Sequence, residues 1–157
     1  MLKVNDQAPV SVQVMSAKGV PITLDQVMKS NPGTSIVLYF YPKDETPGCT
    51  TQACNFRDLT AEIKKAGAVI IGVSKDDLKS HGKFATKHEL PFDLWSDPDH
   101  VLMEAFGVWG ERAFMGRKYF GTSRSTFIIS PAGKIAAVWE KANPITNGTE
   151  VLEFLKK

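Results

Sequence analysis

Two apolar runs with an amphipathic segment between them dominate the hydropathy pattern of the chain. Residues 35–41 are aliphatic or aromatic after an initial serine, and residues 68–73 are again almost wholly apolar. Such runs are typical of strands that are buried on both faces. Over residues 50–65 apolar side chains recur every three or four positions, as on one face of a helix, which Gly67 closes. The pattern predicts a β-α-β unit with parallel strands.

Weaker patterns extend this unit on both sides. Residues 10–23 predict an N-terminal hairpin around Lys18-Gly19, and residues 125–139 predict a second hairpin around a Pro-Ala-Gly turn. Residues 107–121 follow no regular pattern and carry aromatic side chains that look exposed. The other predicted elements are a helix over residues 76–88, a strand over residues 92–95, a helix after Asp97 with Pro98 in its first turn, and a helix over residues 149–155.

Composition narrows the class of protein. The 157 residues include 19 basic and 17 acidic side chains, for a formal net charge of +2, and 43% of the residues are hydrophobic. A chain this apolar and this close to neutrality is not disordered, and its charge gives no support for a nucleic-acid partner. Its length fits a single core. We therefore expect one α/β domain over residues 1–157, in which helices flank a mixed sheet.

The distribution of apolar and cysteine residues points to the cytoplasm. The longest apolar stretches are far shorter than the roughly 20 residues that cross a bilayer, and the first nine residues contain no signal-peptide core. We therefore expect a cytoplasmic protein without a membrane partner. Two cysteines in 157 residues cannot staple a fold. In the cytoplasm a close cysteine pair is more often redox-active or metal-binding than structural.

The segment between the first buried strand and the amphipathic helix carries the most informative residues. Cys49 lies where the helix begins, and a helix N-terminus offers free amide donors and partial positive charge that stabilise a thiolate. Gly48 allows a close approach to the sulfur, and Thr46 can turn its hydroxyl toward it. A buried, inert cysteine is the usual alternative, but a position behind Pro47-Gly48 does not suit a core residue. We expect Cys49 to be reactive and partly exposed.

Cys54 follows Cys49 by five residues. In a continuous helix this spacing places the two Cα atoms about 8.7 Å apart. A disulfide usually requires Cα atoms that are about 4.4–6.8 Å apart. The two sulfurs therefore cannot bond while the first helical turns are intact, and a disulfide requires unwinding from about Thr50 onward.

The polar residues around the two cysteines do not predict a metal site. His81, His88 and His100 are seven and twelve residues apart, which matches no metal-binding helix pattern. The two thiols lack a second pair of ligands, so zinc is not expected, and no phosphate-binding glycine loop is present. The charged residues 43–45 are most simply a solvated loop.

The same residues resemble the active-site pattern of a known family. The string Pro42-x-x-x-Thr46-x-x-Cys49 is similar to the motif of the peroxiredoxins. The resemblance extends to the Q-type, or bacterioferritin comigratory protein, subfamily through Gln52, Ala53, Cys54, Arg57 and Asp58, residues 106–111, Met115-Gly116, and Arg124-x-Thr126-Phe127. It covers nearly the whole chain. It implies a thioredoxin-like fold with an N-terminal β-hairpin and the thiol-dependent reduction of hydrogen peroxide and organic hydroperoxides.

This resemblance implies a role for each candidate residue. Cys49 would be the peroxidatic cysteine, which becomes a sulfenic acid, and Cys54 the resolving cysteine, which forms an intramolecular disulfide with it. Thr46 would hydrogen-bond the peroxide, and Pro42 would shield the sulfur from water. Arg124, which the residues alone would place on the surface, would stabilise the thiolate and polarise the oxygen–oxygen bond. Neither a metal nor an organic cofactor is implied.

The resemblance also bears on partners. Thioredoxin or a glutaredoxin-like dithiol would reduce the disulfide, and the chain would act as a monomer. Two other functions stay open, a general disulfide oxidoreductase and a non-catalytic, chaperone-like module, although the first usually presents C-x-x-C, which the chain lacks. The side chains of Phe114, Met115, Tyr119 and Phe120 belong either to the core or to an apolar surface that a reductant reads.

Overall fold

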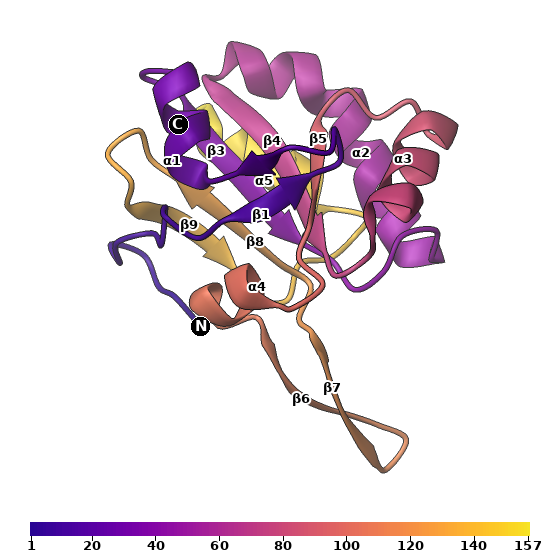
Figure 1. Cartoon of the computed structure of the whole chain (residues 1–157). Coiled ribbons are helices and arrows are strands. Elements are labelled where there is room, and N and C mark those ends of the chain that lie inside the picture. Colours follow the sequence, from indigo (N-terminus) through magenta and orange to yellow (C-terminus); the bar gives the residue numbers. More distant parts are fainter.

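The computed structural model describes residues 1–157 and has a seven-stranded mixed sheet at its centre (Figure 1). The strands lie in the order β2-β1-β5-β4-β3-β8-β9. Their bounds are Val14–Ser16 for β1, Pro21–Ile22 for β2, Ser35–Phe40 for β3, Ala68–Ser74 for β4, Asp93–Ser96 for β5, Ser125–Ile129 for β8 and Ile135–Trp139 for β9. The helices are α1 (Leu24–Ser30), α2 (Pro47–Lys65), α3 (Leu78–Lys87), α4 (Val101–Phe106) and α5 (Asn147–Leu155). No helix is both long and apolar enough to cross a membrane.

The predicted β-α-β unit is confirmed at the middle of this sheet. Strand β3 pairs in parallel with β4 on one edge and antiparallel with β8 on the other, and α2 connects β3 to β4. Because β3 is central, residues 36–40 are all buried, as their apolar run predicts. The two predicted hairpins also form, as β1 with β2 and as β8 with β9.

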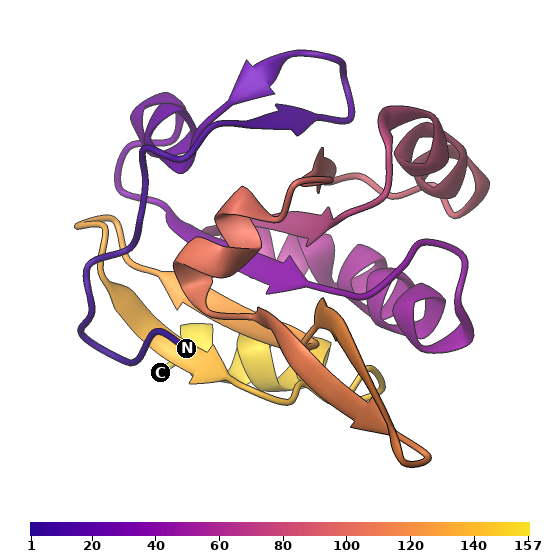
Figure 2. The same ribbon diagram turned by 60° about the horizontal axis from the view of Figure 1, so that its bottom comes forward.

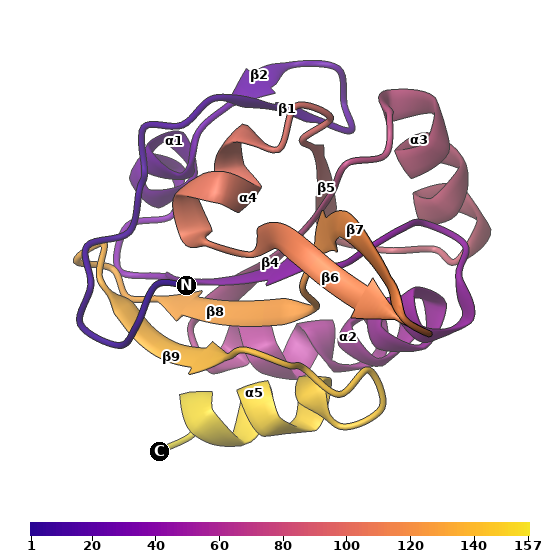
Figure 3. The same ribbon diagram turned by 90° about the horizontal axis from the view of Figure 1, so that it is seen from below.

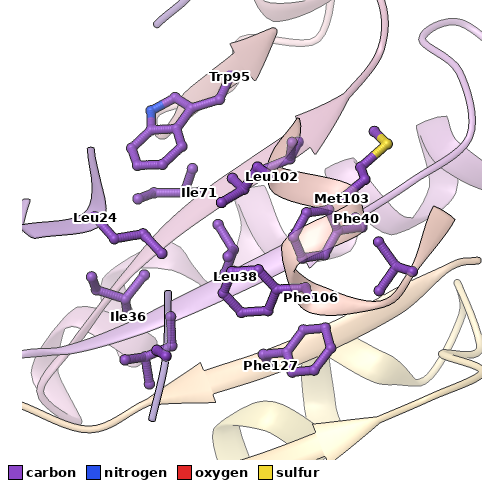
Figure 4. Packing of buried hydrophobic residues seen from close by; sticks show 14 of the residues in the cluster. Leu24, Ile36, Leu38, Phe40, Ile71, Trp95, Leu102, Met103, Phe106 and Phe127 are labelled. Atoms are coloured by element: carbon purple, nitrogen blue, oxygen red, sulfur yellow. The ribbon is translucent and has the colours of Figure 1, made fainter. Parts of the chain in front are cut away.

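Side chains of β3 alternate between two hydrophobic clusters, one on each face of the sheet. Ile36, Leu38 and Phe40 pack with the residues of α1 and α4 that Figure 4 shows from close by. Val37 and Tyr39 point to the opposite face, where α2, α3 and α5 cover the sheet. Figure 3 shows α1 and α4 on one side of the strands and α2 and α5 on the other. The loop that follows β3, residues 41–46, leads to α2 on the face of the sheet that α2, α3 and α5 cover.

Helices α1 and α4 differ from the prediction. Helix α1 was not predicted, although Thr23 and Gln26 form a capping box at its start. Helix α4 begins at Val101, so the prediction that Pro98 lies in its first turn is wrong. The amide of His100 donates to the carbonyl of Asp97 at 3.0 Å, which places Pro98 at the second position of a β-turn before the helix, where its fixed φ is favoured.

Residues 107–121, for which no regular pattern was expected, contain a β-hairpin. Strands β6 (Trp109–Phe114) and β7 (Arg117–Thr122) pair antiparallel and project from the body of the molecule (Figures 1 and 2). Met115 and Gly116 at the tip both have positive φ, as a two-residue hairpin turn requires. Only the base of the hairpin packs on the core, through Trp109, whereas Phe114 and Met115 near the tip are 68% and 88% exposed, so no core-facing alternation runs along its strands. These side chains are therefore not core residues.

Candidate active site

Cys49 is the third residue of α2, whose N-cap is Thr46 and whose first residue is Pro47. The helix starts three residues before the predicted start at Thr50, because proline is favoured at the first helical position. The thiol therefore lies within the first turn, where amide groups without helical partners provide positive potential. The prediction that Cys49 is partly exposed is wrong, since the residue is only 1% exposed and belongs to the cluster between β3 and α2.

Arg124 reaches this buried thiol from the connection between β7 and β8. Its Nη2 donates to Cys49 Sγ at 3.3 Å, and its Nη1 donates to Gln52 Oε1 at 2.8 Å. The guanidinium thus brings a fixed positive charge and a hydrogen-bond donor to the sulfur. The structure therefore places Arg124 where the motif implied, 75 residues from Cys49 along the chain.

Gly48 makes this approach possible. A Cβ atom at residue 48 would lie 3.1 Å from Arg124 Nη2 and 3.8 Å from Pro144 Cγ. The first distance is tighter than most Cβ contacts and the second is an ordinary van der Waals contact, so the absence of a side chain lets the guanidinium pack against the first turn of α2. The close approach that the Pro47-Gly48 pair predicted is present, and the group that approaches is Arg124.

A buried polar chain behind Arg124 holds its guanidinium in place. Gln52 Nε2 donates to Asn147 Oδ1 at 3.3 Å, and Thr126 Oγ1 donates to the same oxygen at 2.7 Å. All three side chains are completely buried. Sequence reasoning assigned no role to Gln52 or Asn147. The only available signal was the spacing of Gln52, three residues after Cys49, which puts both on one face of the helix.

Thr46 and Pro42 lie in the loop before Cys49, and both are partly buried. The hydroxyl of Thr46 donates to the carbonyl oxygen of Lys43 at 2.8 Å. Because this bond uses its only hydrogen, Oγ1 can offer a peroxide only acceptor lone pairs. The shielding role of Pro42 stays a prediction.

Asp44 is buried, so the prediction of a solvated loop is wrong for this residue. Its carboxylate accepts hydrogen bonds from Tyr41 Oη and from Ser80 Oγ, and it lies 2.7 Å from His81 Nδ1. His81 Nε2 lies 2.9 Å from the carbonyl oxygen of Trp95. Since both partners of the ring are acceptors, the imidazolium form, with a hydrogen on each nitrogen, satisfies both contacts.

The same geometry sets the proton affinity of His81. Burial by itself would lower the pKa of His81, but the hydrogen bond and the charge of Asp44, with the Trp95 carbonyl, outweigh it and raise the pKa. This ion pair attaches the loop before Cys49 to α3 and to the end of β5. Sequence reasoning considered His81 only as a metal ligand and missed this role, because Asp44 is 37 residues away.

The two cysteines are not joined. Both Cys49 and Cys54 have free thiols and lie within the continuous helix α2, the state for which their spacing forbids a bond. Cys54 is partly buried, and its Sγ lies 3.9 Å from Nδ1 of His88. His100 stacks on Trp109, and no group of three or more histidine, cysteine or carboxylate side chains gathers at a metal-binding distance.

Comparisons with known proteins agree with this geometry. Residues 4–138 match the model of the AhpC/TSA family. The chain is 50% identical over 124 residues to the peroxiredoxin Bcp of Bacillus subtilis, covering 79% of each chain. It is 46% identical over 125 residues to that of Escherichia coli strain K12, covering 80% of each.

A solved structure extends the match to the fold. The bacterioferritin comigratory protein of Xanthomonas campestris, described for its alkyl peroxide reduction activity, superposes with a TM-score of 0.87 at 38% identity, covering 99% of this chain and 96% of that one. The expected thioredoxin-like fold is thus confirmed. The chain therefore belongs to the AhpC/TSA family and is a peroxiredoxin, a thiol-dependent peroxidase.

Proposed function

We propose that Cys49 attacks hydrogen peroxide and organic hydroperoxides and that Cys54 resolves the product. The contact of Arg124 with Cys49 Sγ, at 3.3 Å in the first turn of α2, supports this most directly. Arg124 supplies a fixed positive charge, and the first turn of α2 supplies amide groups, next to the same sulfur. The alkyl peroxide reduction described for the X. campestris protein supports organic hydroperoxides as substrates.

In the first step the Cys49 thiolate forms a bond to one peroxide oxygen while the oxygen–oxygen bond breaks. The sulfur becomes a sulfenic acid, and the departing oxygen takes a proton to leave as water or an alcohol. Negative charge moves from sulfur to the departing oxygen, and the Arg124 guanidinium stabilises it. Thr46 Oγ1 accepts a hydrogen bond from the peroxide hydroxyl, and Pro42 keeps water from the sulfur.

In the second step Cys54 replaces the sulfenic hydroxyl and water leaves, which requires α2 to unwind from about Thr50. A dithiol such as thioredoxin or a glutaredoxin-like protein then reduces the disulfide by exchange. We further propose that residues 1–157 act as one domain, as a monomer in the cytoplasm. Neither step needs a metal or an organic cofactor.

Stopped-flow mixing with hydrogen peroxide tests this proposal. The unsubstituted chain should react far faster than a free thiol and form one intramolecular disulfide, which mass measurement after thiol alkylation detects. Cys49→Ser should abolish the fast reaction. Cys54→Ser should react once and stop at the sulfenic acid or over-oxidise. Oxidation at the rate of free thiols would contradict the peroxidase role, and normal turnover of Cys54→Ser with thioredoxin would contradict the resolving role.

A further inference from the structure

Cys54 faces a histidine and a carboxylate that the first step does not use. Its Sγ lies 3.9 Å from His88 Nδ1, and His88 Nε2 lies 3.8 Å from Glu45 Oε2. These three side chains come from α2, from the residue that ends α3, and from the loop before Cys49. The arrangement of thiol, imidazole and carboxylate is the one that activates cysteine nucleophiles in general.

The imidazole of His88 is held in this orientation by its neighbours. Its ring packs edge-on against Phe84, with centroids 5.2 Å apart, and its backbone carbonyl accepts a hydrogen bond from Arg57 Nη1 at 2.9 Å. The side chain is only 18% exposed. Its Nε2 is buried and has no hydrogen-bond partner, and the nearest charged oxygen belongs to Glu45.

Glu45 reaches His88 from a strained backbone. Its φ is +63°, a region that residues other than glycine seldom occupy and that is often retained at functional sites. Its carboxylate also pairs with Lys87 Nζ at 3.1 Å. The strained residue thus lies in the loop that presents Cys49, and its side chain reaches the end of α3 that contacts Cys54.

We propose that His88 is the general base for the resolving thiol and that Glu45 positions it. This proposal rests on the resolving role of Cys54. In this step His88, with one hydrogen on Nε2 toward Glu45, accepts the Cys54 proton on Nδ1. The resulting thiolate attacks Cys49 Sγ, the new sulfur–sulfur bond replaces the sulfur–oxygen bond, and the departing hydroxide takes the proton from His88 to leave as water. The sum is one sulfenic acid plus one thiol giving one disulfide plus water.

The other charged groups near this cluster cannot serve as the base. Arg57, on the same helix as Cys54, is always protonated and donates to Asp58 Oδ1 and to the His88 carbonyl. Lys87 is engaged with Glu45. Among these groups only the imidazole of His88 has a side-chain nitrogen within hydrogen-bonding reach of the Cys54 thiol.

The proposal is tested by measuring the two chemical steps, Cys49 oxidation and disulfide formation, separately in the His88→Gln variant. Stopped-flow mixing gives the rate of Cys49 oxidation, and quenching with an alkylating reagent, followed by mass measurement, gives the rate of disulfide formation. We expect the first rate to change by less than about twofold and the second to fall by about 10- to 100-fold. Glu45→Gln should slow the second rate by less. As peroxide is raised, His88→Gln should accumulate Cys49 sulfinic acid before the unsubstituted chain does.

Controls distinguish a base from a packing residue. Loss of packing alone would ease the unwinding of α2 and so speed disulfide formation, whereas loss of the base should slow it. Added imidazole should restore the rate in His88→Ala, as only a missing base allows. Lys87→Gln, which removes the neighbouring charge and keeps the imidazole, should form the disulfide at the normal rate. An unchanged rate in His88→Gln would overturn this proposal while Cys54→Ser still stops at the sulfenic acid; if Cys54→Ser resolves normally, the proposed function itself fails.

Discussion

The two nitrogens of Arg124 that contact Cys49 and Gln52 define the active site at the scale of single residues. The contact with Cys49 places positive charge beside the sulfur that is proposed to react, and the contact with Gln52 fixes the plane of the guanidinium. The planar guanidinium makes these contacts from two separate nitrogens in a fixed geometry, which the single nitrogen of an ammonium group does not reproduce. Reactivity therefore depends on the shape of this side chain as well as on its charge.

Replacing Arg124 tests this dependence. Arg124→Ala should slow oxidation of Cys49 by about 100- to 1,000-fold, since removal of one fixed donor at a developing charge has effects of this size. Arg124→Lys keeps the charge and loses the planar fork, so its rate of Cys49 oxidation should lie between the rates of Arg124→Ala and the unsubstituted chain. Stopped-flow rates at several peroxide concentrations measure both. Equal rates in Arg124→Ala and the unsubstituted chain would exclude the electrostatic role.

Gly48→Ala should disturb the same contact by steric means. The added methyl group would lie 3.1 Å from Arg124 Nη2, so the guanidinium must shift by a few tenths of an ångström and peroxide oxidation should slow several-fold. Gly82→Ala is the matched control, because residue 82 lies in α3 with no atom within 4 Å of an added Cβ. It should leave the rate unchanged and raise the free energy of unfolding by up to about 1 kcal/mol.

Two tyrosines of β3 and the following loop give a matched pair for stability. Tyr39 Oη is buried without a partner, whereas Tyr41 Oη donates to Asp44. Burial raises the pKa of both phenols well above the ordinary value, so both stay neutral. Tyr39→Phe should change the free energy of unfolding by less than about 1 kcal/mol, and Tyr41→Phe should lower it by about 1.5–3 kcal/mol. Urea titrations of both variants check this; equal losses would contradict it.

At the scale of elements, the single helix α2 carries both the proposed nucleophile, Cys49, and the proposed resolving thiol, Cys54. Its end before Gly67 and the place of Cys49 near its start were predicted from sequence because helix termini are set by local chemistry, but its first residue, Pro47, lies three residues before the predicted start. The β6–β7 hairpin was not predicted, since the large apolar side chains near its tip face solvent and show no core-facing alternation. The glycine of its Met115-Gly116 turn, where both residues have positive φ, is the one local sequence signal that could have identified it.

Oxidation should therefore change the helix content of the molecule. The Cys49–Cys54 disulfide requires the first turns of α2 to unwind, so the far-ultraviolet circular dichroism of the chain should lose helical signal after one equivalent of peroxide and regain it with dithiothreitol. Cys54→Ser, treated in the same way, should keep its signal. A disulfide-linked form with unchanged helix content would refute the spacing argument.

At the scale of the whole molecule, the buried pair of Asp44 and His81 ties three separate elements together. It connects the active-site loop to α3 and, through the Trp95 carbonyl, to β5. Removing one partner would leave the other charge buried and unpaired, at a cost of about 3–5 kcal/mol. The pair thus couples the geometry of the site to global stability.

This coupling predicts a pH dependence. The folded chain holds the pKa of His81 above the unfolded value of about 6.5, so the stabilisation is complete below about pH 6.5 and is lost as pH rises through the folded pKa. The free energy of unfolding should decrease over that range. Asp44→Asn/His81→Gln, which removes both charges, should show a flatter profile. Chemical denaturation at several pH values measures both, and parallel profiles would contradict the assignment.

Local chemistry alone determined the β3–α2–β4 unit and the place of Cys49 at a helix start. The apolar periods, the proline and the glycines act over a few residues, so they can be read without knowing the rest of the chain. Tertiary structure alone decided which groups meet the two thiols: Arg124 at Cys49, itself held by Gln52, and His88 at Cys54, itself next to Glu45. It also buried Asp44 against His81. These contacts join distant segments, and their partners depend on strand order and helix packing, which no local pattern encodes.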